Sequence, residues 1–195
     1  LENILHATRQ SLTGKKQVLV VSGGPGTGKS VIAINALSRL MGRRLNARYV
    51  TPNLAPRAVF EVKLRDSFKL GQIKELFSGS ASYTGLPKNE FDILIVDEAH
   101  RLKLRTQYSK GGDNQIREII HASKTAVFFI DESQKVTWKD IGEISEIEKF
   151  AKMTGAEIIK LELKSQFRCS NSENYLDWLD STLNITSSEN KYYFQ

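Results

Sequence analysis

The feature that most constrains the fold is a glycine-rich segment between an apolar run and an amphipathic one. Val18–Val21 form a short apolar run, the eight residues Gly23–Ser30 follow, and Val31–Leu40 then have the pattern of a helix. A strand that enters a helix through a tight glycine turn is typical of layered α/β folds. We therefore expect a mainly parallel sheet covered by helices.

The same alternation of strand and helix patterns continues along the chain. Five short apolar runs are strand candidates: Gln17–Ser22, Arg48–Thr51, Asp92–Val96, Ala126–Ile130 and Glu157–Leu163. Their continuous apolar character is expected of strands covered on both faces. Helix candidates lie between them, at about 29–41, 55–66, 70–77, 113–122 and 141–153. Residues 78–89 are rich in Ser, Gly and Pro, which indicates a surface loop. The predicted fold class is α/β, with a central, mostly parallel five-stranded sheet and helices on both faces.

Composition and cysteine content exclude several other classes. The 195 residues are 40% hydrophobic and 26% charged, as in ordinary globular proteins. The apolar runs are far too short to span a bilayer, so we expect no membrane partner. A single cysteine, Cys169, excludes an internal disulfide framework and a zinc-finger module. This usage favours a cytoplasmic protein, and the oligomeric state stays open.

The glycine-rich segment is a candidate phosphate-binding loop of the form G-x-x-x-x-G-K-S. Its residues are Gly23, Gly24, Pro25, Gly26, Thr27, Gly28, Lys29 and Ser30. Glycines allow backbone N–H groups to curl around phosphates at a helix N-terminus. Lys29 would reach the β- and γ-phosphates, and Ser30 would offer its hydroxyl to Mg²⁺. A chance glycine-rich turn is the alternative, but the strand and helix in register favour ATP and Mg²⁺ as cofactors.

A pair of acids follows the apolar run that ends at Val96. Asp97 and Glu98 would lie at the carboxyl edge of the sheet, beside the phosphate loop. Asp97 would hold Mg²⁺, directly or through water, and Glu98 would position and deprotonate the attacking water. Two acids can also simply cap a following helix, but the phosphate loop makes that alternative less favoured. The pair also argues against a small-molecule kinase, which has less need of a water-activating glutamate.

Two further polar segments are candidate parts of the same site. The segment Ile130–Gln134 ends an apolar strand, where a polar side chain can sense the γ-phosphate, although an ordinary strand-to-loop turn explains the pattern equally well. Arg168 follows the last predicted strand and could stabilise charge on the transferred phosphoryl group. An ordinary surface arginine is the alternative for Arg168.

The ordered segments GGPGTGKS, VTPNLAP, ILIVDEAHRL, FFIDESQ and LKSQFRC resemble superfamily 1 helicases, and more narrowly the bacterial Schlafen group-3-like DNA/RNA helicase domain. The resemblance covers most of residues 17–183. It implies a RecA-like P-loop NTPase lobe in which another strand separates the acid-pair strand from the phosphate-loop strand. It also implies that Gln134 contacts the γ-phosphate and that Arg168 supplies an arginine to the same phosphate. Residues 51–53 match the family's nucleic-acid-contacting segment only loosely, and His100 completes a DEAH sequence more typical of superfamily 2.

Basic residues are concentrated in two segments. Residues 39–74 contain nine basic residues and two acidic ones, and residues 101–117 contain five and one. A basic groove suits sequence-independent binding of a nucleic-acid backbone, and Phe60, Phe68 and Tyr83 could stack on bases. Solvated helix faces and core aromatics are the alternative for any single residue. For the whole block we favour single-stranded nucleic acid, DNA or RNA, as the partner.

Three divisions of the chain are expected. Residues 1–163 would form a RecA-like ATP-binding lobe, residues 164–186 the start of a truncated second lobe, and residues 187–195 resemble a tag remnant. The predicted function is the Mg-dependent ATP-binding and hydrolysing motor lobe of a DNA/RNA helicase or translocase. The fragment alone would be weakly active, because the missing second helicase lobe completes the site. The alternatives are a P-loop ATPase that drives protein remodelling or packaging, and a nucleotide-dependent binding module without turnover.

Overall fold

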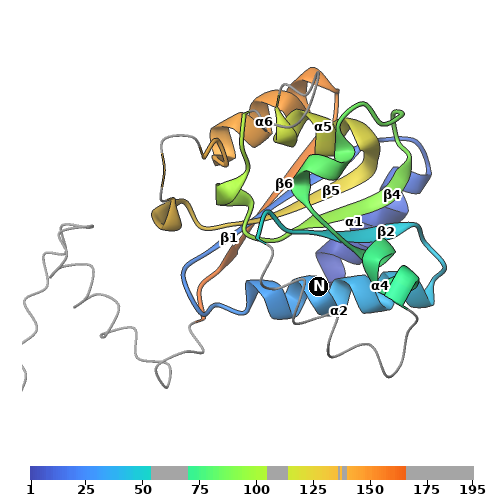
Figure 1. Ribbon diagram of the computed structural model, residues 1–195, viewed down its shortest axis with the longest axis horizontal. Helices are drawn as coiled ribbons and strands as arrows, with labels where there is room; N and C mark the ends of the chain where they lie inside the picture. Colours follow the sequence, from blue (N-terminus) through green and yellow to red (C-terminus); the bar gives the residue numbers. More distant parts are fainter. Residues whose placement is uncertain (54–69, 105–113, 136, 138–139, 166–195) are drawn as a thin grey trace, which may run out of the picture.

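A parallel sheet forms the centre of the molecule (Figure 1). The computed structural model describes residues 1–53, 70–104, 114–135, 137 and 140–165. Within these residues the strands pair in the order β3-β2-β4-β5-β1-β6, and every paired strand is parallel to its neighbour. The strands are β1 (Gln17–Gly23), β2 (Ala47–Val50), β3 (Phe77–Ser78), β4 (Phe91–Val96), β5 (Ser123–Ile130) and β6 (Glu157–Leu163).

The sheet has six strands in the described residues, so the prediction of five was wrong by one. The additional strand, β3, has only two residues, which pair with Tyr49 and Val50 of β2. A strand of two residues is too short to show a pattern of apolar and polar residues, so only its pairing with β2 defines it. The other five strands lie where the sequence predicts them.

The strand order places β5 between β4 and β1, as the family resemblance implied. The register pairs Ser22 with Ile130 and Val96 with Phe128, so the carboxyl ends of the three strands lie close together. The phosphate loop follows β1, the acid pair follows β4, and Asp131 follows β5. Three polar segments that are distant in sequence therefore meet at one edge of the sheet.

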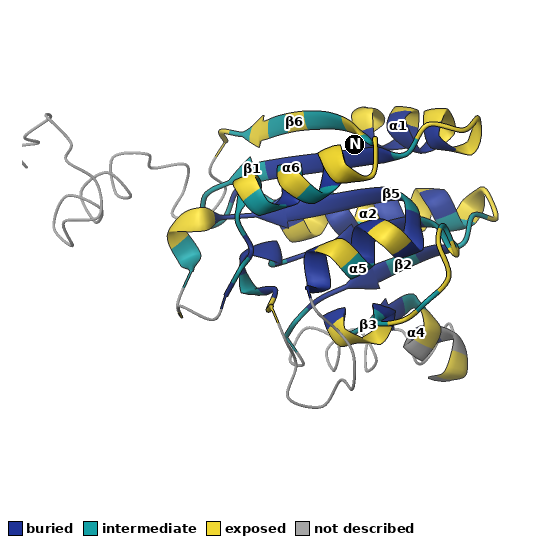
Figure 2. Cartoon of the chain, turned by 90° about the horizontal axis from the view of Figure 1, so that it is seen from above, coloured by how far each residue is buried: buried dark blue, intermediate teal, exposed yellow. Residues whose placement is uncertain are grey.

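Helices cover both faces of the sheet, as predicted (Figure 1). On one face lie α1 (Glu2–Leu12), α2 (Lys29–Gly42) and α4 (Leu70–Leu76), and on the other α5 (Gln115–Ala122) and α6 (Ile144–Met153). Each face has its own apolar core, and the central strands are buried between them, whereas β6 at the edge is partly exposed (Figure 2). Asn114 caps α5 by accepting hydrogen bonds from the N–H groups of Ile116 and Arg117.

Helix α1 has no counterpart among the predicted helices. Its buried face contains two hydroxyl residues, Thr8 and Ser11, beside the apolar Ile4, Leu5 and Ala7. The hydroxyls donate to the carbonyls of Ile4 and Thr8, so they are buried without a loss of hydrogen bonding. These polar side chains interrupt the apolar periodicity from which a helix is predicted.

Several expectations fall outside the described residues: the helix at 55–66, the second-lobe segment 164–186 beyond residue 165, and residues 187–195. The predicted loop at 78–89 contains a 3₁₀ turn at Ser80–Tyr83. In the described part of the chain, no helix is both long enough and apolar enough to cross a membrane.

Candidate nucleotide site

The phosphate loop connects β1 to α2 at the carboxyl edge of the sheet. Gly26 and Gly28 have φ angles of 77° and 83°, in the left-handed region that glycine adopts without steric cost. Gly28 is the N-cap of α2, so the first helical residues are Lys29 and Ser30. The free backbone N–H groups of that first turn and the positive end of the helix dipole favour an anion at this point.

Lys29 is almost fully buried, with 8% of its side chain exposed. Its Nζ donates to the carbonyl oxygens of Gly23 and Gly24 at 2.6 and 2.8 Å. The same atom lies 3.7 Å from Oδ2 of the buried Asp131. The ammonium group is thus held inside the loop by two carbonyls and one carboxylate.

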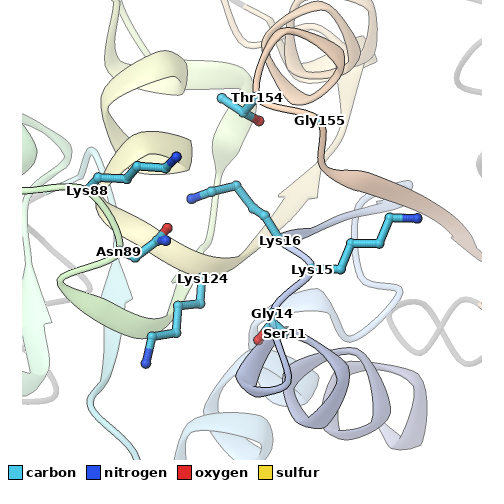
Figure 3. Close-up of a pocket in the computed structure, with 9 residues that line it drawn as sticks. All are labelled: Ser11, Gly14, Lys15, Lys16, Lys88, Asn89, Lys124, Thr154 and Gly155. Atoms are coloured by element: carbon cyan, nitrogen blue, oxygen red, sulfur yellow. The ribbon is translucent and has the colours of Figure 1, made fainter.

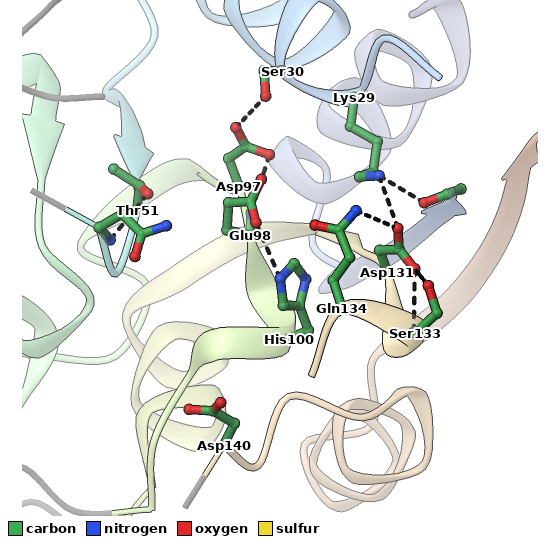
Figure 4. Close-up of polar contacts among 12 residues, drawn as sticks. Lys29, Ser30, Thr51, Asp97, Glu98, His100, Asp131, Ser133, Gln134 and Asp140 are labelled. Atoms are coloured by element: carbon green, nitrogen blue, oxygen red, sulfur yellow. Dashed lines mark hydrogen bonds and ion pairs between the residues drawn. The ribbon is translucent and has the colours of Figure 1, made fainter. Parts of the chain in front are cut away.

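Asp97 is the centre of a hydrogen-bond cluster at the end of β4 (Figure 4). Its Oδ2 accepts hydrogen bonds from Ser30 Oγ at 2.6 Å and from Tyr49 Oη at 2.5 Å. Its Oδ1 accepts from the backbone N–H of Glu98 at 3.0 Å. Burial and the charge of Asp97 raise the pKa of Tyr49 far above its usual range, so this tyrosine stays a neutral donor. A carboxylate and a hydroxyl in contact are the hard oxygen ligands that Mg²⁺ prefers.

Glu98 adopts an uncommon backbone conformation, with φ 55° and ψ 42°. Its carboxylate lies 3.0 Å from Nε2 of the fully buried His100. The contact with His100 lowers the pKa of Glu98 below its usual value, against the opposing effect of burial, and the charge of Lys29 acts in the same direction as His100. Glu98 is therefore a carboxylate at neutral pH, as a proton acceptor must be.

Asp131 links the strand β5 to Gln134. Its Oδ2 accepts a hydrogen bond from Gln134 Nε2 at 2.7 Å, and its Oδ1 accepts from Ser133 Oγ at 2.6 Å. Because Lys29 lies against the same Oδ2, one buried carboxylate contacts both the phosphate-loop lysine and the glutamine (Figure 4). The position of Gln134 is thus coupled to the environment of Lys29.

A cavity of about 640 Å³ lies beside these groups. The phosphate loop and the start of α2 form most of its lining, and the side chains of Glu98 and Gln134 also line it. A volume of this size lies within the range of small-molecule sites, roughly 300–1,000 Å³. Among the described residues, no three His, Cys, Asp or Glu side chains gather as a metal site made of protein ligands alone.

The structure brings together five of the predicted site residues: Lys29, Ser30, Asp97, Glu98 and Gln134. Gly23 and Gly24 do not line the cavity but accept hydrogen bonds from Lys29, whereas the rest of the loop does line it. Arg168 lies outside the described residues.

Sequence reasoning assigned no site role to Tyr49 or Asp131, and it took His100 only as part of a DEAH sequence. Tyr49 lies inside a strand and has the pattern of a core residue, so nothing in the sequence indicates its contact with Asp97. Asp131 follows an apolar strand in the same way as Asp97 does, and that parallel could have indicated its role.

The described part of the basic segment 39–74 does not form one continuous face. Arg39, Arg43 and Arg44 lie at or just beyond the C-terminal end of α2, far from the phosphate loop at its other end. Tyr83 is buried and packs edge-on against Phe91, so of the two interpretations offered for it the structure favours the core aromatic over a base-stacking residue. Its ring fills the core between the sheet and α5. Phe60 and Phe68 lie outside the described residues.

A parallel sheet with a phosphate loop after β1, an acid pair after β4 and β5 between these strands defines a P-loop NTPase of RecA-like fold. The sequence matches one domain family over residues 16–194, described as Schlafen group 3, DNA/RNA helicase domain. The chain belongs to this family, as its sequence motifs suggested. A search of curated proteins finds no match.

The similar solved structures have low sequence identity to this chain. The Pif1 helicase from Candida albicans is similar with a TM-score of 0.51 and 17% identity, over 93% of this chain and 43% of that one. AMPPCP-bound DnaA from Aquifex aeolicus is similar with a TM-score of 0.41 and 14% identity, over 96% of this chain and 52% of that one. The chain thus spans about half the length of the solved proteins it matches.

Proposed function

We propose that this domain binds Mg-ATP and hydrolyses it as the motor lobe of a DNA/RNA helicase or translocase. The observation that carries the proposal is the convergence of Lys29, Ser30, Glu98 and Gln134, which follow three strand ends, on one cavity. Asp97 contacts Ser30 beside it. Membership of a DNA/RNA helicase domain family supports the same function.

The proposed reaction is in-line attack of water on the γ-phosphate. Glu98, held as a carboxylate beside His100, would accept a proton from the water. Lys29 would leave its two carbonyl partners for the phosphate oxygens and neutralise their charge. Ser30 and Asp97, which already contact each other, would hold Mg²⁺, and that ion would neutralise charge on the phosphates. Gln134 would contact the γ-phosphate, and Arg168 would supply a further positive charge.

The proposed partners are single-stranded nucleic acid and a second helicase lobe. A motor of this type works by closing two lobes on a nucleotide, so the isolated domain is expected to turn over slowly. Hydrolysis by a longer chain that contains the second lobe should rise when single-stranded DNA or RNA is added. A rate that is insensitive to both nucleic acids would contradict the helicase proposal and favour a motor that acts on proteins.

The test compares ATP hydrolysis by the wild-type chain, Glu98→Gln and a matched control, Glu75→Gln. Glu75 is exposed on α4, away from the cavity, so its substitution removes the same charge without touching the site. Loss of a general base is expected to lower the turnover rate by about 10²-fold or more, with nucleotide affinity retained. Equal rates for all three proteins, each above the rate of hydrolysis without protein, would show that Glu98 is not the general base and would refute the proposed mechanism.

A further inference from the structure

A second cavity lies at the opposite edge of the sheet from the nucleotide site. It has a volume of about 180 Å³, and four lysines line it: Lys15, Lys16, Lys88 and Lys124. We call it the lysine pocket. The residues come from segments at the amino ends of β1, β4 and β5, and Gly155 contributes from the turn before β6. The parallel sheet thus gathers four cations that are distant in sequence at its amino edge.

Two of the four lysines are neutralised by carboxylates. Lys15 pairs with Glu157 at 3.3 Å, and Lys124 pairs with Asp92 at 2.8 Å. Figure 3 shows both side chains directed away from the centre of the pocket. The charges of these two lysines are therefore balanced, and their ammonium groups do not point into the pocket that their chains line.

The other two lysines face each other across the pocket. Figure 3 shows the ammonium groups of Lys16 and Lys88 directed toward one another. In the described part of the chain, no carboxylate lies within 4.0 Å of either ammonium. Two like charges without a counter-charge repel each other, and an anion between them would remove that repulsion.

Lys16 is fixed in place by the end of α5 and the start of β5. Its Nζ donates to the carbonyl oxygens of Ile120, at 2.6 Å, and Ser123. An ammonium group has three N–H donors, so one remains for a ligand. Burial, and to a smaller extent the charge of Lys88, lower the pKa of Lys16 to about 8.

Asn89 adds an amide to the same pocket. Its Oδ1 is shielded from solvent and has no hydrogen-bond partner among the described residues. Figure 3 places this side chain between Lys16 and Lys124. A half-turn of the amide exchanges Oδ1 for Nδ2, which would give a bound anion a further donor.

We propose that the lysine pocket binds one phosphate group, held by Lys16, Lys88 and Asn89. A phosphate has several oxygens, each of which can accept from a different donor, and its charge would neutralise the facing lysines. The volume corresponds to about six water molecules, which suits a phosphate group but not a whole nucleotide. The phosphate is either free or part of a nucleic-acid backbone. The site is separate from the nucleotide cavity, which lies at the other edge of the sheet.

The test titrates inorganic phosphate into the 195-residue chain by calorimetry at constant ionic strength. Four proteins are compared: wild type, Lys88→Met, Lys29→Ala and Lys149→Met. Lys88 is exposed, so its substitution should leave the fold intact, and loss of the repulsion should keep the melting temperature at or above that of the wild type. Lys149 is an exposed lysine of α6 paired with Glu146, and its substitution is the control for net charge.

Lys88→Met is expected to bind phosphate at least about tenfold more weakly at this site, because a hydrogen bond to a charged group is lost. Lys29→Ala and Lys149→Met are expected to retain it. The proposal is overturned if Lys88→Met binds phosphate like the wild type, or if Lys29→Ala abolishes all phosphate binding. A single-stranded decanucleotide distinguishes the sources: displacement of phosphate supports a backbone phosphate as the ligand, and retention supports a free one.

Discussion

Replacement of Gly142 by alanine is expected to destabilise the domain strongly. The segment that contains Gly142 packs on the 3₁₀ turn after β4, where Ile141 donates its N–H to the carbonyl of Leu102 at 2.8 Å. A Cβ on Gly142 would lie 1.9 Å from the carbonyl oxygen of Ala99 and 2.4 Å from Cα of His100. Both are backbone atoms, so no side-chain rotation relieves the clash, and one of the two segments must move.

The size of the effect follows from the kind of contact. Overpacking of a well-packed site costs typically about 1–3 kcal/mol, and a clash with backbone belongs at the upper end. For a domain of this size, 3 kcal/mol corresponds to a melting temperature lower by about 6–12 °C. The displaced turn directly follows Glu98, so ATP turnover should fall as well.

Thermal unfolding followed by circular dichroism measures the change, with Gly42→Ala as the matched control. Gly42 is exposed at the last position of α2, and a Cβ there would meet nothing within 4 Å. Alanine in a helix is favoured over glycine by about 0.5–1 kcal/mol, so Gly42→Ala should melt slightly higher than the wild type. If Gly142→Ala melts at the wild-type temperature, the close packing of the two backbone segments is refuted.

Three further substitutions test the site and the fold. Tyr49→Phe removes one hydrogen bond to the carboxylate of Asp97. The Mg²⁺ concentration for half-maximal hydrolysis should therefore change, whereas the affinity for ATP should not. An unchanged Mg²⁺ titration would contradict this role of Tyr49. Asp131→Asn removes the negative charge that contacts Lys29 and supports Gln134. The turnover rate should therefore fall by a larger factor than the affinity for a fluorescent ATP analogue. Equal losses of rate and affinity would argue against a positioning role for Asp131. Burial would raise the pKa of Asp92, but hydrogen bonds from Lys124 and the backbone outweigh it, and the pKa is lowered. Asp92→Asn should therefore lower the free energy of unfolding by about 1 kcal/mol at pH 7. This difference from the wild type should vanish as the pH falls below the unfolded-state pKa of about 3.9 and through the lower folded-state pKa. A difference in stability that persists at low pH would contradict the prediction.

The central part of the fold is predictable because local pattern and tertiary environment agree there. The strand before the phosphate loop and the strand before Asp97 are buried on both faces, and their sequences are continuous apolar runs. Helix α1 and strand β3 could not be predicted in this way. Buried hydroxyls on α1 satisfy their hydrogen bonds within the helix, and β3 is defined only by its partner β2.

Some residues of the candidate site could be predicted from the sequence, and others could not. Lys29, Ser30 and the acid pair belong to motifs whose spacing along the chain indicates their chemistry. The contacts of Tyr49 and Asp131 depend instead on which strands are neighbours, because β2 adjoins β4 and β5 adjoins β1. The family resemblance implied that β5 adjoins β1, but nothing in the residues indicated that β2 adjoins β4, so the contact of Tyr49 with Asp97 becomes visible only in the folded chain.

The internal contacts of Lys29 have a consequence for ligand selection. Its ammonium is already satisfied by two carbonyl oxygens and lies near Asp131, so a ligand gains from this lysine only if its own acceptors are stronger than those it displaces. The charged oxygens of a phosphate group are stronger acceptors than neutral backbone carbonyls, so we expect a phosphate to displace Gly23 and Gly24 from Lys29. The contacts within the loop therefore set how strong a ligand's acceptors must be before that ligand gains from Lys29.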